Sequence, residues 1–453
     1  MVAFPLGSKL APLYNLDWSQ QQFATIFVAA LMMWVFRLLP DFIPALFVIL
    51  STLLLSLTPQ NVALSGFTSG SFFLALSVFG LGVLVINSGI FYRFSLLALK
   101  HLPKKTIVLQ VIAFVIGILL TSFMTGKNSR ITLMSYLIQE ISQAAGYKKK
   151  NSAIESIAAC GFFGVSILSV IFMTGKFNNL VLYGMLPTNT KLQFNWLYWL
   201  YCASIPALVL ILGFLIMRML LFRSTQNPQT STEKIAHDLA ELGKTTISEW
   251  AALLAIMALM VGLMTSSISD LAPAWISLSI FYIVLCMGFV SRDAFKTQIN
   301  WPLLFYLGFM ISITSIMQYL KIDVLLSTHL NWLSVFADKN LLLFFTMVYF
   351  AGILGNFILG SGITPPLLFM LLLPIIGQAN FSPWVLIFVL LMSTESWLFP
   401  YQASFYRNFE DEMKRTNLIR FNKIFIINTT FIFIRLVAIL AGILFWHKLG
   451  LLV

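Results

Sequence analysis

Long apolar runs, separated by short polar stretches, make up most of the sequence. Residues 111–120 are apolar except at one glycine, unlike the alternating strands of a membrane β-barrel. Because lipid offers no hydrogen-bond partner to a bare backbone, each run is predicted to be a helix. At roughly 20 apolar residues per crossing, we expect about ten full spans. The runs lie at 21–39, 42–58, 71–90, 106–122, 152–184, 195–222, 249–268, 272–290, 301–320, 341–358, 383–400 and 422–447.

Two shorter apolar stretches, at 123–145 and 359–380, are interrupted by Gly, Pro and polar residues. We predict that each forms a re-entrant hairpin. The run Gly117-Ile-Leu before the first stretch has a counterpart, Gly352-Ile-Leu, before the second. Three spans precede the helix that leads into each hairpin and two follow the hairpin, so the halves have opposite orientations. The prediction is an all-α polytopic membrane protein with an inverted-topology repeat.

Composition agrees with a membrane protein, and charge sets its orientation. Hydrophobic residues make up 59% of the 453 positions, charged residues only 10%, and the mean hydropathy is +0.91. These values exclude an ordinary soluble enzyme. Cytoplasmic loops retain Lys and Arg. If residues 223–248 are cytoplasmic, 19 of the 28 basic residues fall on the inner side and five outside, which places both termini outside.

The predicted organisation has five parts. They are an N-terminal segment (1–20), a first repeat (21–222), a cytoplasmic linker (223–248), a second repeat (249–447) and a C-terminal tail (448–453). No signal-peptide pattern precedes the first span. We expect a multi-pass protein that lies in the lipid bilayer of a bacterial inner membrane.

Four basic residues remain at membrane depth, namely Lys127, Arg130, Lys176 and Arg435. Lys127 and Lys176 each end a copy of the pentapeptide FMTGK, where we expect a helix to break. A helix that stops inside the membrane leaves backbone groups for an ion or a substrate to satisfy. Glycine allows the break, and the Lys, Asn, Ser and Thr near it supply donors. A midplane site for an anion is therefore predicted.

These charged residues also have structural interpretations. Lys127 and Lys176 would snorkel to the inner surface if they lay near helix ends. We favour the binding role, because charged residues at membrane depth are functional by default. Arg130 either contacts the substrate or pairs with the inner headgroups or with Glu140. For Glu395 and Arg435, we favour a structural ion pair over a proton relay.

The sequence lacks the signatures of the main catalytic classes. Its four histidines show no metal-ligand spacing, so no metal site is predicted. No Walker-type phosphate loop, nucleophile elbow or zinc-protease helix is present. We therefore predict a protein that is not an enzyme, with no cofactor and no nucleic-acid partner. An enzyme or structural subunit on a transporter fold is the alternative function class.

Several motifs resemble those of the divalent anion/sodium symporters, in particular the bacterial permeases for dicarboxylates. They are LSGFTS at 64–69, GKNSR at 126–130, MTGKFNNLVLYG at 173–184, LAELGKTTISEW at 239–250, GSGITPP at 360–366 and LFPYQASF at 398–405. The resemblance covers nearly the whole chain. It implies an elevator-type homodimer in which the hairpins and broken spans form the mobile domain.

The resemblance also implies that substrate carboxylates bind at the two hairpin tips, where the family usually carries a Ser-Asn-Thr motif. Here the first motif is replaced by Gly126, Lys127 and Asn128, and the second leaves Ser361, Gly362 and Thr364 as candidates. With the residues at the breaks, the candidate substrate-binding set is Lys127, Asn128, Ser129, Lys176, Asn178, Asn179, Ser361, Thr364, Pro400 and Gln402.

Sodium coupling is a further point on which this chain departs from the family pattern. In the family, a hairpin tip and the following break cage a sodium ion, whereas here Lys127 and Lys176 stand in those loops. Two positive charges about 4 Å apart repel by several kcal/mol even at an effective dielectric near 20. We therefore predict sodium-independent transport of a small divalent anion. A sodium-coupled symporter of sulfate or another oxyanion is the alternative, since one tip can hold sulfate.

Overall fold

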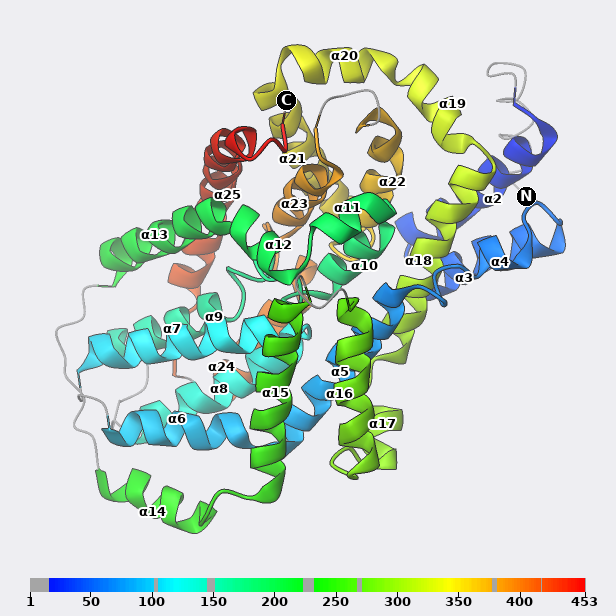
Figure 1. Cartoon of the computed structure of the whole chain (residues 1–453). Helices are drawn as coiled ribbons and strands as arrows, with labels where there is room; N and C mark the ends of the chain where they lie inside the picture. Colours follow the sequence, from blue (N-terminus) through cyan, green and yellow to red (C-terminus); the bar gives the residue numbers. More distant parts are fainter. Residues whose placement is uncertain are drawn as a thin grey trace.

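The computed structural model describes residues 16–101, 105–144, 151–222, 232–266, 271–376, 381–416 and 418–452. The regular elements in these ranges are helices, joined by turns and loops, and one isolated antiparallel bridge links Phe381 and Leu452 (Figure 1). The first half and linker contain α2 (Trp18–Val35), α3 (Phe42–Leu54), α4 (Gln60–Ala63), α5 (Gly70–Ser88), α6 (Ile90–His101), α7 (Thr106–Phe123), α8 (Lys127–Ala144), α9 (Ser152–Gly164), α10 (Phe177–Met185), α11 (Thr188–Gln193), α12 (Trp196–Cys202), α13 (Ser204–Leu221) and α14 (Thr232–Leu242). The second half contains α15 (Ile247–Thr265), α16 (Pro273–Cys286), α17 (Arg292–Thr297), α18 (Trp301–Tyr319), α19 (Ile322–His329), α20 (Asn331–Lys339), α21 (Leu341–Ile358), α22 (Thr364–Ile376), α23 (Pro383–Thr394), the short 3-10 helix η1 (Pro400–Gln402), α24 (Ser404–Thr416) and α25 (Asn422–Lys448).

Long apolar helices dominate the described part of the chain. Seven of them, α5, α7, α13, α15, α18, α21 and α25, are at least 18 residues long and apolar enough to cross a membrane. Five shorter apolar helices accompany them, namely α3, α9, α16, α22 and α23. This confirms the predicted all-α polytopic architecture. The N-terminal segment up to residue 15 lies outside the described residues.

The two halves repeat the same order of elements and exchange partners. Helix α3 of the first half packs against α18 of the second, and α16 of the second half packs against α5 of the first. In the same way, α10 packs against α22 while α24 packs against α8. Each contact therefore has a counterpart in which the halves change places, as an inverted repeat requires.

The repeated glycines mark equivalent packing contacts in the two halves. A Cβ atom on Gly117 of α7 would lie 2.6 Å from the carbonyl carbon of Gly164, at the end of α9. A Cβ atom on Gly352 of α21 would lie 1.9 Å from the Ser393 Oγ atom of α23. Small residues allow such close approach between membrane helices. The sequence repeat thus encodes the docking of α7 on α9 and of α21 on α23.

The hairpins differ in extent from the prediction. Each expected range, 123–145 and the described part of 359–380, contains a single helix, α8 or α22. The turn lies at the beginning of the range, at 124–126 in the first half and at 359–363 in the second. Each hairpin therefore pairs that helix with the apolar helix before it, α7 or α21. Composition could not separate them, because an 18-residue apolar helix looks the same as a spanning helix or as a hairpin arm.

The linker carries a helix and docks through Arg93 of α6. The guanidinium group donates from Nη1 to the Gly243 carbonyl at 2.9 Å and from Nη2 to the Leu242 and Lys244 carbonyls at 3.2 and 3.3 Å. Its Nε atom pairs with Glu249 of α15 at 2.7 Å. Helix α14 also packs against α6. The described part of the linker is therefore anchored to the first half rather than only solvated.

Candidate functional site

The four interruptions predicted to face the substrate lie together. They are the first tip (124–126), the loop between α9 and α10 (165–176), the second tip (359–363) and the segment after α23 (395–399). Thr174 donates to the Ser122 carbonyl at 2.7 Å, which joins the loop to the end of α7. The Asn178 side chain donates to the Ser361 carbonyl at 2.5 Å, which joins α10 to the second tip.

Side-chain hydrogen bonds give the 165–176 loop its shape. The Asn179 side chain donates to the carbonyls of Ser169 and Phe172, each at 2.8 Å. The Trp199 indole donates to the Val170 carbonyl at 3.2 Å. Buried carbonyls outside a helix need such partners, because lipid supplies none. The loop is therefore fixed by its own residues and by α12.

A cavity of about 410 Å³ opens between the tips. Its volume lies within the range of small-molecule sites. Among the residues that the structure describes, no carboxylate lines it, whereas two lysines and several amides and hydroxyls do. The polar lining side chains are Thr125, Lys127, Asn128, Ser129, Lys176, Asn178, Gln298, Asn300, Asn356, Ser361, Thr394, Gln402 and Ser404, and the apolar ones include Phe79, Phe177, Trp397 and Phe405.

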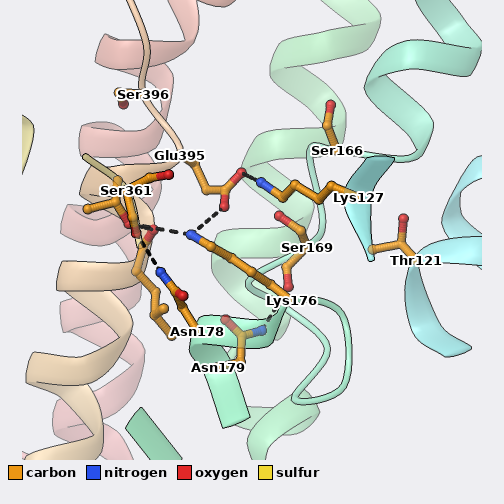
Figure 2. A network of polar contacts seen from close by, with 12 residues as sticks. Thr121, Lys127, Ser166, Ser169, Lys176, Asn178, Asn179, Ser361, Glu395 and Ser396 are labelled. Carbon is orange, nitrogen blue, oxygen red and sulfur yellow. Dashed lines mark hydrogen bonds and ion pairs between the residues drawn. The ribbon is translucent and has the colours of Figure 1, made fainter. Parts of the chain in front are cut away.

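The two lysines converge on one buried carboxylate (Figure 2). Glu395 follows the last turn of α23, and its side chain is 2% exposed. Its Oε1 atom lies 2.8 Å from the Lys176 Nζ atom, and its Oε2 atom pairs with Lys127. Lys127 begins α8 and Lys176 directly precedes α10, so the triad ties three helix breaks together.

All four cations predicted at membrane depth interact electrostatically with Glu395. Lys127 and Lys176 touch it, while Arg130 and Arg435 are buried farther away. The Arg130 Nη1 atom donates to the Thr121 carbonyl at 3.3 Å. One carboxylate against four cations, of which Arg130, Lys176 and Arg435 are buried, leaves a positive region beneath the cavity, and such a region attracts anions.

Glu395 forms a structural ion pair, as was favoured for it, but Arg435 does not. Glu395 pairs with the lysines, and Arg435 instead donates from Nη1 to the Ser396 Oγ atom at 3.5 Å. The sequence could not reveal this partner, because Lys127 and Glu395 lie 268 positions apart. Arg130 is fully buried and does not line the cavity, so it contacts neither headgroups nor the cavity.

The structure brings seven of the ten candidate residues to the cavity. These are Lys127, Asn128, Ser129, Lys176, Asn178, Ser361 and Gln402. Asn179, Thr364 and Pro400 do not line it. Asn179 holds the loop, and Thr364 is fully buried and donates to the Gly360 carbonyl at 2.8 Å. Pro400 begins the short helix η1, where its ring fits the first turn.

Several lining residues were missed. Asn356 lies in the helix that leads to the second tip, within the repeated glycine segment, which was a usable signal. Gln298 and Asn300 come from the connection between α17 and α18, where no break was predicted. The aromatic side chains of Trp397 and Phe405 follow α23, and the sequence pattern did not distinguish them from lipid-facing aromatics.

The described residues contain one group that could hold a metal ion. His237, Asp238 and Glu241 present ligand atoms within 4.8 Å of one another on the linker helix α14. His237 and Glu241 are exposed, and exposed acidic groups of this kind are common without an ion. None of the three lines the cavity.

Comparison with known proteins shows which family the chain matches and which solved structure has a similar fold. Residues 1–452 match the family described as the sodium:sulfate symporter transmembrane region. The inner membrane protein YbhI of Escherichia coli strain K12 is 20% identical over 313 residues, which are 67% of this chain and 64% of YbhI. The YdaH transporter of Alcanivorax borkumensis, whose crystal structure is described as revealing an unusual topology, superposes with a TM-score of 0.55. That likeness, at 14% identity over 86% of this chain and 88% of YdaH, concerns the fold alone.

The family match agrees with the motifs, the inverted repeat and the cavity between two hairpin tips. It extends over the whole described structure, so both repeats are included. The chain belongs to the sodium:sulfate symporter family of divalent anion/sodium symporters and is a multi-pass membrane protein.

Proposed function

We propose that this protein is a secondary active transporter of small divalent anions, a C4-dicarboxylate or related carboxylate, in the bacterial inner membrane. The observation that carries the proposal is the lining of the cavity, which offers two ammonium groups and no carboxylate. Helices α8, α10 and α24 all begin at the cavity. Helix N-termini carry partial positive charge and bind carboxylates or phosphates.

Donors on opposite walls favour a dicarboxylate over sulfate. Asn128 and Ser129 lie in the first turn of α8, directly after the first tip, whereas Ser361 belongs to the second tip. A dicarboxylate needs donors at both ends, and charge-assisted hydrogen bonds to each carboxylate provide affinity and orientation. Sulfate could be held by one wall alone.

Transport without sodium is proposed because lysines stand at both loops that would cage the ion. Lys127 and Lys176 both contact Glu395, so their ammonium groups lie close to each other. A sodium ion beside them would be repelled. Exchange, proton coupling or the gradient of the substrate itself would then drive the cycle.

We further propose an elevator-type movement in a homodimer. The contacts α3–α18 and α5–α16 join the first helices of the two halves, and α8–α24 and α10–α22 join the hairpins to the broken helices. We take these two groups as the two bodies, with α10 of the second also packed against α5 and α18 of the first, and the second group carries most of the cavity lining. Movement of the second body against the first would expose the cavity alternately to each side.

Uptake into liposomes that contain the purified protein tests the proposal. Labelled succinate, malate, citrate and sulfate are compared, each in sodium medium and in choline medium. We expect saturable uptake of at least one dicarboxylate, competed by the others and equal in the two media. Sulfate uptake that requires sodium would favour the alternative function, and no uptake of any of the four anions would remove the proposal.

A further inference from the structure

We propose that Glu395 is the internal counter-charge that allows the empty transporter to reorient. This inference rests on the proposed function. In the empty cavity, Glu395 takes the place of the substrate as the partner of Lys127 and Lys176. When a substrate carboxylate enters, Lys127 passes from Glu395 to the substrate.

The geometry distinguishes the two lysines. The Lys127 side chain is 15% exposed, whereas those of Lys176 and Glu395 are 9% and 2% exposed. Lys127 also lies over the Phe405 ring, with Nζ 4.7 Å from the centroid. Lys176 has a second partner, Thr394 Oγ1, at 3.4 Å. Lys127 is therefore the cation that the substrate can reach, and Lys176 stays with Glu395.

Glu395 has no substitute in this part of the protein. Among the described residues, no acidic side chain lines the cavity, and no salt bridge other than those with Glu395 reaches either lysine. Without the Glu395 carboxylate, two buried ammonium groups would face each other with no counter-charge. Breaking a buried pair by removing one partner is costly, because the remaining charge stays uncompensated.

This role affects empty and loaded transporters differently. A bound dianion brings its own negative charge, so a transporter loaded with substrate does not depend on Glu395 for compensation. The empty transporter does depend on it. Loss of the Glu395 charge should therefore slow the return of the empty cavity and spare movement with substrate, which turns a net transporter into an exchanger.

Transport assays in proteoliposomes separate the return of the empty cavity from movement with bound substrate. Exchange is measured as entry of labelled succinate, or of whichever anion the wild type transports best, into liposomes loaded with the same unlabelled anion. Net uptake is measured into liposomes without internal substrate, with the membrane potential clamped. For Glu395→Gln we expect exchange to persist and the ratio of net uptake to exchange to fall at least about tenfold, because the empty state carries an uncompensated charge.

Three further variants make the result decisive. Glu395→Asp keeps the carboxylate and should retain net uptake. The double variant Lys127→Met with Glu395→Gln has the same net charge at these three positions as the wild type. It should recover the ratio of net uptake to exchange, with a weaker affinity for the substrate. Glu155→Gln removes a buried carboxylate that pairs with Lys423 at 3.5 Å, outside the cavity, and should leave the ratio unchanged.

The outcomes for the inference and for the proposed function are distinct. An unchanged ratio in Glu395→Gln, or equal loss of both activities in folded Glu395→Gln, overturns the counter-charge role. If Glu395→Gln does not fold, the double variant is compared with the wild type instead. A ratio of net uptake to exchange that stays low in the double variant overturns the counter-charge role of Glu395. A wild-type protein that neither exchanges nor takes up any of the four anions removes the proposed function itself.

Discussion

Asn178 and Asn179 show what sequence can and cannot say about single residues. Both follow the second FMTGK string, and both were expected to bind substrate. In the structure, Asn178 lines the cavity, while Asn179 is fully buried and holds the 165–176 loop. Polar composition at a helix break predicts that donors will be needed there. Which of the two side chains faces the cavity and which binds backbone carbonyls depends on packing, and the local sequence pattern does not show that packing.

Asn128 and Asn179 should therefore respond differently to replacement by alanine. Asn128→Ala removes an exposed donor from the first tip and should raise the apparent KM by about tenfold, the value of one charged hydrogen bond. Asn179→Ala leaves the Ser169 carbonyl without its partner, removes one of the two hydrogen bonds to the Phe172 carbonyl, and should lower stability by about 1–3 kcal/mol. Uptake kinetics and thermal unfolding in detergent are measured for both variants. A stability loss in Asn128→Ala together with a raised KM and normal stability in Asn179→Ala would contradict these two roles.

At the scale of elements, the long apolar runs predicted the helices well, but they did not show which helices pair to form the hairpins. The glycine repeat placed both hairpin turns near the right positions, since tight packing and turns demand glycine there. Hydropathy could not reveal the contacts of Arg93 with its linker partners, which lie 149 to 151 positions away in the sequence. Arg93 was counted only as a cytoplasmic charge, yet it is 8% exposed and binds three carbonyls and Glu249.

Arg93→Lys tests this anchor between α6 and the linker. Lysine keeps the charge but cannot supply the planar fork of donors, so at least two hydrogen bonds are lost. We expect about 2 kcal/mol lower stability and faster proteolysis of the linker. Arg407→Lys, at an exposed position of α24, is the matched control. Equal stability of the two variants would show that the anchor contributes nothing.

At the scale of the whole molecule, the inverted repeat was predictable because it rests on order and orientation rather than on side-chain detail. The exchanged contacts between halves, such as α8 with α24, were not, because they join segments far apart in the chain. For the same reason, the sequence did not reveal that Glu395 pairs with Lys127 and Lys176. The cavity is formed at these long-range contacts, which explains why its residues were predicted individually while its charge balance was not.

Orientation in the membrane follows from the distribution of basic residues and has its own test. Helices α14 and α20 lie at opposite ends of the molecule (Figure 1). We expect α14 inside and α20 outside. In a protein without its three native cysteines, Glu241→Cys on α14 and Asp338→Cys on α20 are treated on intact cells with an impermeant thiol reagent. Labelling only at position 338 is expected, and labelling only at position 241 would invert the topology.

The exchanged contacts also bear on how such a chain arose. If the two halves were once identical separate chains, two copies inserted in opposite directions would form the same contacts as an antiparallel homodimer. Such an ancestor would carry the same charges in both loops. Here the loop before α10 ends in Lys176, while the corresponding segment after α23 begins with Glu395. This difference in charge requires unequal halves, so it arose only after the two halves had diverged from each other.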